Sequence, residues 1–362
     1  MNNRVQRLRE RLTSEGIDAL LVSTPGNRYY LSGSRGAGHL LISQREALLA
    51  TDFRYWEQAA QQAKDFELVK LTQSDMKAWL PALLKRVGAR TLGFEADNVT
   101  YAVYDTIKGA TETLEPGERP ALKPTYSLVE GLRLIKDEYE YAIITRAIEI
   151  ADHAFEAVAV RLVPGMTEKQ VAWELEKSMR DQGAEGPSFG TIVAFGPNAA
   201  MPHHRPDATA LKIGQPVIID MGARLEGYCS DLSRTVILGR PDAQFRKIYD
   251  VVLAAQETCI NAVQAGMTGH DADRLARDII EKAGYGDQFG HSTGHGVGLD
   301  IHESPWVSRN AKTELADGMF FTVEPGVYIP GWGGVRIEDL LVMEHGRGRD
   351  LTRAHKRETV PV

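Results

Sequence analysis

The chain has 362 residues, of which 43% are hydrophobic and 25% are charged, and its formal net charge is −7 at pH 7. This composition excludes wholesale disorder, and the acidic balance gives no electrostatic basis for binding nucleic acid or an anionic membrane. Two cysteines, Cys229 and Cys259, are too few for a disulfide scaffold or a cysteine-based zinc site. The charged N-terminal segment and the lack of about 18 consecutive apolar residues predict a cytoplasmic protein without a signal peptide or membrane span.

Residues 1–126 alternate helical and strand patterns and predict an N-terminal α/β domain of mixed topology. A helix over the first 12 residues precedes a strand at 19–22, which we expect to end at a Pro25-Gly26 break. Apolar runs on either side of a polar turn, residues 44–46, predict a hairpin. The other elements predicted here are helices at 55–64 and 76–87 and strands at 66–71 and 91–95.

The rest of the chain contains an internal repeat. Gly165-Met-Thr167 recurs 101 residues later as Gly266-Met-Thr268, and each copy follows one helical pattern and precedes another. Each half then supplies a strand that ends in a carboxylate, Asp220 in the first and Glu324 in the second. We therefore expect a duplicated C-terminal domain over 132–362, with a site between its two halves.

A predicted hairpin at 216–238 carries two aspartates. A turn centred near Leu225–Glu226 would place Asp220 opposite Asp231, with Cβ atoms ~4.5–5.5 Å apart. Two like charges are unfavourable in such positions unless a cation lies between them. Alternatively, one aspartate caps a turn and the other faces solvent, and the hairpin alone does not decide between these interpretations.

Histidines are concentrated in the second half. His291, His295 and His302 fall within twelve residues of a glycine-rich run, and His203-His204 forms a second cluster. The glycines argue against a helix and indicate close backbone approach to another group. A lone histidine is most often a structural hydrogen-bonding residue, but three in this setting favour metal ligation or catalysis.

Two glutamates complete a candidate metal site. Glu324 and Glu338 each close an apolar run, where an acid is costly to bury without a partner. The candidate ligands are Asp220, Asp231, His295, Glu324 and Glu338. Their four carboxylates would neutralise two divalent ions, and an oxygen-rich set suits Mn²⁺, Co²⁺ or Zn²⁺ pairs better than a single zinc. Two ions about 3.5–4 Å apart can hold a water between them, which predicts hydrolytic chemistry.

On these motifs the chain resembles the pita-bread metallopeptidases, within them the proline-specific Xaa-Pro aminopeptidases and prolidases. The resemblance covers nearly the whole chain and rests on the Asp220/Asp231 spacing, His295-Gly-Val-Gly, Glu324-Pro-Gly and Arg336-Ile-Glu338. It implies an α+β fold: a C-terminal pita-bread domain, with a curved antiparallel sheet, a pseudo-twofold repeat and outer helices, after a creatinase-like N-terminal α/β domain. It also implies proline-containing peptides as substrates and a homodimer.

The resemblance implies individual roles as well. Asp220 would bind one metal, His295 and Glu324 the other, and Asp231 and Glu338 would bridge the two. Glu324 would also act as the general base. The remaining site residues implied are His203 and His302, which stabilise the scissile carbonyl and the oxyanion, and His291 and Arg336, which orient the substrate and Glu338.

One position departs from the prolidase pattern. In many prolidases an arginine a few residues beyond the equivalent of His302 receives the dipeptide carboxylate, and Trp306 stands there in this chain. An indole cannot pair with a carboxylate, so we predict an Xaa-Pro aminopeptidase acting on longer peptides, with Trp306 in substrate binding. The alternatives are an Xaa-Pro dipeptidase, with Arg309 as a substitute cation, and an inactive peptide-binding homologue. A metal-free creatinase-type hydrolase is disfavoured because all five ligands are kept.

Overall fold

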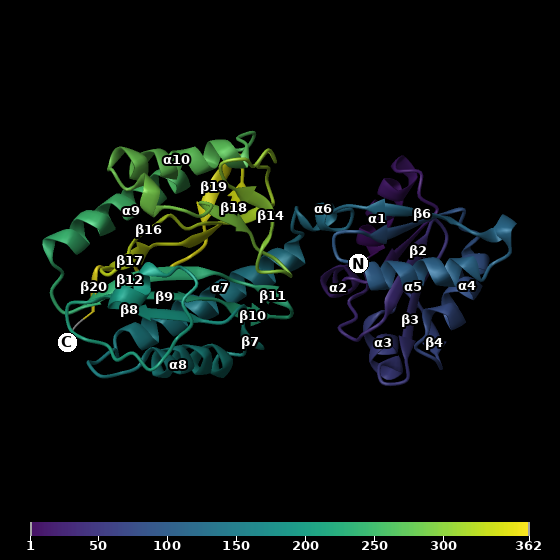
Figure 1. Ribbon diagram of the computed structural model, residues 1–362, viewed down its shortest axis with the longest axis horizontal. Coiled ribbons are helices and arrows are strands. Elements are labelled where there is room, and N and C mark those ends of the chain that lie inside the picture. Colours follow the sequence, from purple (N-terminus) through teal and green to yellow (C-terminus); the bar gives the residue numbers. More distant parts are fainter. Residues whose placement is uncertain (1, 361–362) are drawn as a thin grey trace. The chain divides into compact units, whose positions relative to one another are not determined.

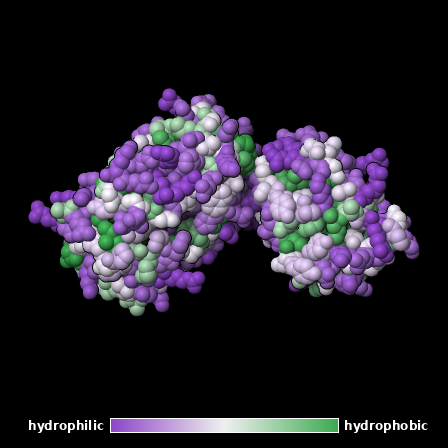
Figure 2. Space-filling model, turned by 45° about the horizontal axis from the view of Figure 1, so that its top comes forward, coloured by the Kyte–Doolittle hydropathy of each residue, from purple (hydrophilic) through white to green (hydrophobic). Residues whose placement is uncertain are grey.

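The computed structural model describes residues 2–360 and divides the chain into two compact units, Met1–Arg133 and Leu134–Val362 (Figure 1). Figure 2 shows hydrophilic residues over most of the visible surface of each unit, with smaller hydrophobic areas scattered among these residues. Among the described residues, none of the helices combines the length and the apolar content needed to cross a lipid bilayer.

The first unit is built on a mixed six-stranded sheet with the strand order β4-β3-β2-β1-β5-β6. The strands β1–β2 and β2–β3 pair antiparallel, whereas β1–β5, β3–β4 and β5–β6 pair parallel. The strands are β1 (Ala19–Val22), β2 (His39–Ser43), β3 (Ala47–Asp52), β4 (Glu67–Leu71), β5 (Thr91–Glu95) and β6 (Ala121–Thr125). The helices are α1 (Asn2–Ser14), α2 (Pro25–Ser32), α3 (Trp56–Gln62), α4 (Met76–Val87), α5 (Tyr101–Glu112) and α6 (Glu130–Arg133), with a 3-10 turn η1 (Pro116–Glu118).

The predicted hairpin of this unit is confirmed as β2–β3, and the predicted helix at 76–87 is α4. Strand β1 ends before Pro25-Gly26, as expected, but these residues do not form an irregular segment, because Pro25 begins helix α2. Proline is well suited to the first helical turn, where its missing N–H would have no intrahelical partner. The sequence prediction also omitted α5, which Thr100 caps by accepting a hydrogen bond from the Val103 N–H.

The second unit packs two helix pairs against antiparallel strands. Helices α9 and α10 lie above these strands in Figure 1, and α8 lies below them. The helices are α7 (Glu138–Ala159), α8 (Glu168–Asp181), α9 (Ala243–Ala262) and α10 (Gly269–Lys282), with 3-10 turns η2 (Gly196–Ala200) and η3 (Gly286–Gln288).

Two larger sheets carry the two halves of this unit, in the orders β20-β12-β9-β8 and β14-β13-β15-β18-β19. Smaller sheets pair β11-β10-β7 and β16-β17. The strands of the first half are β7 (Gly186–Pro187), β8 (Ile192–Phe195), β9 (Pro216–Met221), β10 (Ala223–Leu225), β11 (Tyr228–Cys229) and β12 (Leu232–Leu238). The later strands are β13 (Gly294–Gly296), β14 (Glu303–Val307), β15 (Phe320–Val323), β16 (Gly326–Ile329), β17 (Gly333–Arg336), β18 (Asp339–Glu344), β19 (Arg347–Asp350) and β20 (Thr359–Val360).

The predicted repeat is present in the backbone of this unit. Thr167 and Thr268 each begin a helix with a capping box, completed by Gln170 in α8 and Asp271 in α10. The glycines two residues before them have φ angles of 90° and 87°. The Gly165 N–H donates to the Leu211 carbonyl, and the Gly266 N–H donates equally to the Leu315 carbonyl. The same local chemistry therefore directs the same turn twice.

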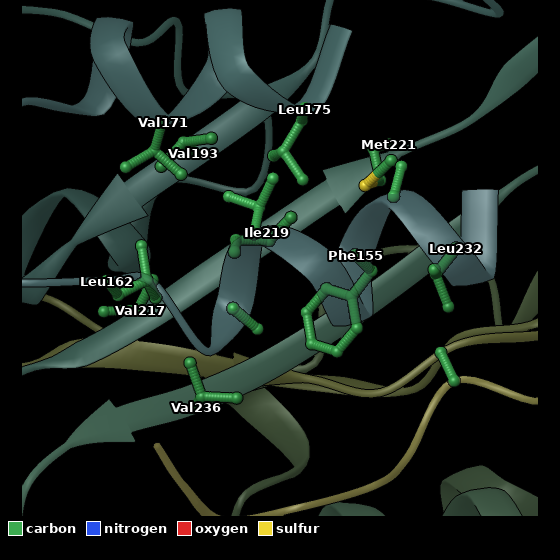
Figure 3. Packing of buried hydrophobic residues seen from close by; sticks show 14 of the residues in the cluster. Phe155, Leu162, Val171, Leu175, Val193, Val217, Ile219, Met221, Leu232 and Val236 are labelled. Carbon is green, nitrogen blue, oxygen red and sulfur yellow. The ribbon is translucent and has the colours of Figure 1, made fainter. Parts of the chain in front are cut away.

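Each half has its own hydrophobic core between its helix pair and its strands. In the first half, Phe155 from α7 and Leu175 from α8 pack against Val217 and Ile219 of β9 and Val236 of β12 (Figure 3). The second core joins α9 and α10 to β15 and β18. Burial of large aliphatic and aromatic side chains, each contributing about 1.5–3 kcal/mol, holds the strands that carry the polar site residues.

Candidate functional site

The site residues predicted from the sequence all line one cavity of about 790 Å³ in the second unit. They come from both halves: Asp220 lies near the end of β9 and Asp231 just before β12, whereas His295 lies in β13 and Glu324 directly after β15. The full set is Asp220, Asp231, His295, Glu324 and Glu338, with His203, His291, His302, Trp306 and Arg336 around it. The structure thus brings together residues that are up to 135 positions apart in the sequence.

The predicted pairing of the two aspartates is wrong in register. Ser233, and not Asp231, lies opposite Asp220 in the β9–β12 ladder. The turn is centred on Glu226-Gly227, one residue later than expected, and both residues have positive φ angles of 47° and 83°. Such angles define a type I′ hairpin turn, which matches the twist of the strands. The two aspartates are therefore diagonal neighbours on one face.

The glycine-rich strand β13 confirms the predicted close approach of backbones. A Cβ atom on Gly294 would lie 1.9 Å from the carbonyl oxygen of Thr322, and one on Gly296 would lie 2.2 Å from that of Ser304. Only glycine fits at such distances. These contacts hold β13 between β14 and β15, and the His295 imidazole lies beside the carboxylates of Asp231 and Glu324.

The central side chains are close enough to share a cation. The ligand atoms of Asp231, His295 and Glu338 lie within 4.8 Å of one another. His295 Nε2 lies 3.6 Å from Asp231 Oδ2 and 3.3 Å from Glu324 Oε1. Asp231, His295 and Glu338 are buried, with 5%, 5% and 2% of their surfaces exposed.

Arg336 organises the polar contacts between the two halves. Its Nη2 donates to Asp220 Oδ2 at 2.6 Å, and its Nε donates to Ser233 Oγ at 2.9 Å. Ser233 Oγ in turn donates to Glu338 Oε2 at 2.8 Å. Arg336 Nη1 donates to the Tyr328 hydroxyl at 2.8 Å, and that hydroxyl lies 2.9 Å from His291 Nε2. These hydrogen bonds orient the carboxylates of one half from the other.

Burial and mutual repulsion of the carboxylates shift the pKa values of the cluster. Burial raises the pKa of Asp231 and of Glu338 well above the usual carboxyl range, and neighbouring carboxylates raise both further. Burial also opposes ionisation of Glu324, but its hydrogen bond with His295 and the charge of that imidazole outweigh this and lower the pKa of Glu324 to about 2. The same hydrogen bond raises the pKa of His295 against the effect of burial.

This donor set fits divalent cations. Asp220 Oδ1 is buried and has no hydrogen-bond partner among the described residues. The protons that Asp231 and Glu338 hold so tightly would be replaced by a cation, which removes the repulsion between the carboxylates. Carboxylate oxygens with one imidazole are suitable ligands for Mn²⁺, Co²⁺ or Zn²⁺.

The residues predicted to contact the substrate lie around this cluster. The His302 ring lies 4.3 Å from that of His295, centroid to centroid, and burial, followed by the charge of His295, lowers the pKa of His302. Trp306 lines the cavity and is 45% exposed. The substitute cation considered from the sequence, Arg309, instead donates to Glu281 Oε1 at 3.1 Å in a largely exposed ion pair.

Three further residues of the site were missed in the sequence. Tyr328 follows Glu324 by only four positions, but nothing in its context distinguishes it from a core aromatic; burial raises its pKa to about 12. Arg205 lines the cavity, and its place beside His203-His204 was an available signal. Glu168 is fully buried at the start of α8 and accepts hydrogen bonds from the 195–207 segment, which carries His203, His204 and Arg205.

Comparisons with known proteins agree with this geometry. Residues 142–345 match "Metallopeptidase family M24", and residues 4–135 match "Creatinase/Prolidase N-terminal domain". An Xaa-Pro dipeptidase of Pyrococcus furiosus is 37% identical, and the alignment covers 98% of this chain and 99% of that protein. The structure of an Xaa-Pro dipeptidase from Bacillus anthracis matches with a TM-score of 0.94, 42% identity and 99% coverage of both chains. An X-Pro aminopeptidase structure from Thermotoga maritima matches with a TM-score of 0.90, 36% identity and 99% coverage of both chains.

The fold and site define a metal-dependent hydrolase with a duplicated catalytic unit. The chain belongs to metallopeptidase family M24, with a creatinase/prolidase N-terminal domain. The predicted pita-bread fold and the prediction of a metallo-exopeptidase are confirmed. Enzymes of this family use divalent metal ions.

Proposed function

We propose that the protein hydrolyses Xaa-Pro dipeptides, as a prolidase. The supporting observation is that relatives named Xaa-Pro dipeptidase match over nearly the whole chain while all five candidate ligands of this chain line one cavity. This is the alternative interpretation of the sequence, and it has better support than the aminopeptidase that Trp306 suggested.

We assign two divalent ions, Mn²⁺, Co²⁺ or Zn²⁺, to the five ligands. Asp220 would hold one ion, His295 and Glu324 the other, and Asp231 and Glu338 both. Four carboxylates carry four negative charges, and Arg336 beside Asp220 offsets only one of them, so a single divalent ion leaves the cluster negative. When bound, such ions activate a water molecule and polarise the scissile carbonyl.

The protein's own side chains would handle the proton and the developing charge. Glu324, whose Oε1 lies 3.3 Å from His295 Nε2 within the cluster, would take a proton from the attacking water as the general base. The water oxygen bonds to the carbonyl carbon, the C–N bond breaks, and the proton passes to the proline nitrogen. His302 and His203 would donate hydrogen bonds to the carbonyl oxygen as it becomes an oxyanion.

Apolar side chains beside this charged cluster suit a proline ring. Phe189, Ile192, Ile301 and Trp306 line the same cavity as the carboxylates. An apolar wall with a few polar groups is typical of a small-molecule site. Arg336 and His291, which share the Tyr328 hydroxyl, would orient Asp220 and the substrate.

A second candidate function is an Xaa-Pro aminopeptidase that cleaves longer peptides. The observation that favours it is Trp306, a half-exposed indole in the cavity, which accepts a neutral amide at lower cost than a carboxylate. The similarity to the Thermotoga maritima enzyme is compatible with this candidate.

A matched substrate panel tests the proposal. Purified protein with added Mn²⁺, Co²⁺ or Zn²⁺ is assayed on Ala-Pro, Ala-Pro-Ala and Ala-Ala, with a chelator-treated sample as the control. We expect the highest kcat/KM on Ala-Pro, none on Ala-Ala and none after chelation. A higher kcat/KM on Ala-Pro-Ala would replace the dipeptidase by the aminopeptidase, and Trp306→Arg should then shift the ratio towards Ala-Pro.

A further inference from the structure

Two arginines line the cavity, and they differ in how their guanidinium groups are used. Arg336 is buried and donates to Asp220, Ser233 and the Tyr328 hydroxyl. Arg205 is exposed, and its guanidinium makes no hydrogen bond or ion pair with another residue in the described part of the chain. Arg336 is therefore committed to the protein, whereas Arg205 presents a free positive charge to whatever enters the cavity.

The backbone around Arg205 is held in place although its side chain is free. His204 Nε2 lies 2.7 Å from Glu168 Oε2, and the Asp207 N–H donates to the same oxygen at 3.0 Å. The other oxygen of Glu168 accepts hydrogen bonds from the Phe195 N–H and the Asn198 side chain. Pro206 restricts the backbone next to Arg205. A fixed loop with an unpaired cation is preorganised to bind an anion.

The same four hydrogen bonds account for the placement of Glu168, His204 and Asp207 without a metal ion. Their ligand atoms are close together, but the Glu168 oxygens are already used by donors of the loop. We interpret this group as the clamp that holds the 195–207 segment, and hence Arg205, at the cavity.

A dipeptide substrate needs a cation in this cavity. The free carboxylate of Xaa-Pro is attached directly to the proline ring, so it loses water when the ring binds against apolar side chains, and that loss is costly without a charged partner. Trp306 offers no charge, and Arg309 is engaged with Glu281. Among the cavity-lining residues, Arg205 remains as the available guanidinium, with the fork geometry that suits a carboxylate.

We propose that Arg205 binds the C-terminal carboxylate of the dipeptide and so determines the preference for dipeptides over longer peptides. This inference rests on the proposed prolidase function. It assigns carboxylate binding to the 195–207 segment, whereas the sequence alone offered only Arg309 for this role.

The test compares a carboxylate with its neutral amide. Steady-state kinetics on Ala-Pro and Ala-Pro-amide are measured for the wild type, Arg205→Gln, Arg205→Lys and the control Arg309→Gln. We expect Arg205→Gln to raise KM for Ala-Pro by about 10-fold to 100-fold, the loss typical of a hydrogen bond to a charged group, with little change in kcat or in KM for the amide. Arg205→Lys should recover part of the loss, and Arg309→Gln should leave kcat and KM unchanged for both substrates.

Binding provides a readout that does not depend on cleavage. Calorimetric titration with free proline and with prolinamide should show that the wild type prefers proline and that Arg205→Gln loses this preference. An unchanged acid-to-amide ratio in Arg205→Gln, in kinetics and in binding, would overturn the assignment of Arg205 while leaving the proposed function intact. The converse result is a wild type that cleaves no Xaa-Pro substrate and still prefers proline to prolinamide, with this preference absent in Arg205→Gln. That result would refute the prolidase function and keep Arg205 as a carboxylate-binding residue.

Discussion

The two halves of the catalytic unit share a backbone plan and divide the chemistry unequally. Both halves contain a glycine of positive φ and a capping threonine between two helices. Of the five candidate metal ligands, however, the first half supplies two aspartates, whereas the second supplies His295, Glu324 and Glu338. Duplication of the scaffold therefore did not require duplication of the site residues, because the strand ends fix positions and leave the side chain at each position free to vary.

The halves also depend on each other for orientation of their acids. Asp220 of the first half is held by Arg336 of the second, and Glu338 of the second half is held by Ser233 of the first. Each half further uses a buried acid to fix a loop with a cavity histidine: Glu168 holds the His203 loop, and Asp273 accepts hydrogen bonds from the N–H and hydroxyl of Thr293, near His291. The site is thus a property of the interface between the halves.

Removing one shared carboxylate from either half should have the largest effect. Asp231→Ala and Glu338→Ala are each expected to lower kcat/KM by at least about 10³-fold and to reduce bound metal, because each removes one of the two carboxylates assigned to both cations. Activity assays and elemental analysis measure both quantities. Glu344→Gln, which removes a surface partner of Arg349, is the control and should keep both. Wild-type activity with full metal content in either alanine variant would contradict the ligand assignment.

The next largest effect is expected from two histidines, one from each half, that would contact the substrate. His302→Ala and His203→Ala should lower kcat by about 10²–10³-fold without changing metal content, because each removes a donor to the oxyanion. Kinetics and elemental analysis on the same preparation decide the point. Metal loss in His302→Ala, whose ring lies beside that of His295, would mean that His302 is a ligand instead.

Smaller effects on activity are expected from the two loop clamps. Glu168→Gln and Asp273→Asn should each lower kcat/KM by roughly 10-fold while metal stays bound, because misoriented supporting groups typically cost this much or more. Asp273→Asn should lower the unfolding temperature further than Glu168→Gln does, since it leaves the buried Arg277 guanidinium without its charged partner. Glu176→Gln on the exposed face of α8 serves as the control. Equal unfolding temperatures for both clamp variants would show that the halves are supported alike.

The last prediction concerns stability, with no change in activity expected, and lies in the first half. Burial raises the pKa of Asp152 from 3.8 to about 6, so the folded protein holds this proton more tightly than the unfolded chain does. Stability from this group is therefore lost as pH rises from about 4 to about 6. Asp152→Asn should be more stable than the wild type at pH 8, by on the order of 2–3 kcal/mol at most, with this advantage lost near pH 4. Chemical denaturation at the two pH values measures this, and a pH-independent difference would contradict it.

Much of the local structure was predictable from the sequence, and the candidate ligands chosen from it line one cavity. The repeated Gly-Met-Thr at 165–167 and 266–268 predicted a helix after each copy, and both helices are present. The glycines of β13 predicted close backbone contact, which Gly294 shows. These features depend on neighbouring residues, so the sequence contains the information directly. The roles of the individual ligands stay predictions.

The register and the long-range contacts were decided by tertiary structure. A shift of the hairpin turn by one residue, to Glu226-Gly227, changed the partner of Asp220 from Asp231 to Ser233, and strand pattern alone does not distinguish these registers. The contact of Arg336 with Asp220 spans 116 positions, and Arg205 acquires its place from Glu168 in another element. The sequence by itself determined which residue types form the candidate site and where many of the helices and strands begin. Only packing of the two halves decided which charges are paired and which remain free, because hydrogen-bond partners distant in sequence meet only when both hydrophobic cores are formed.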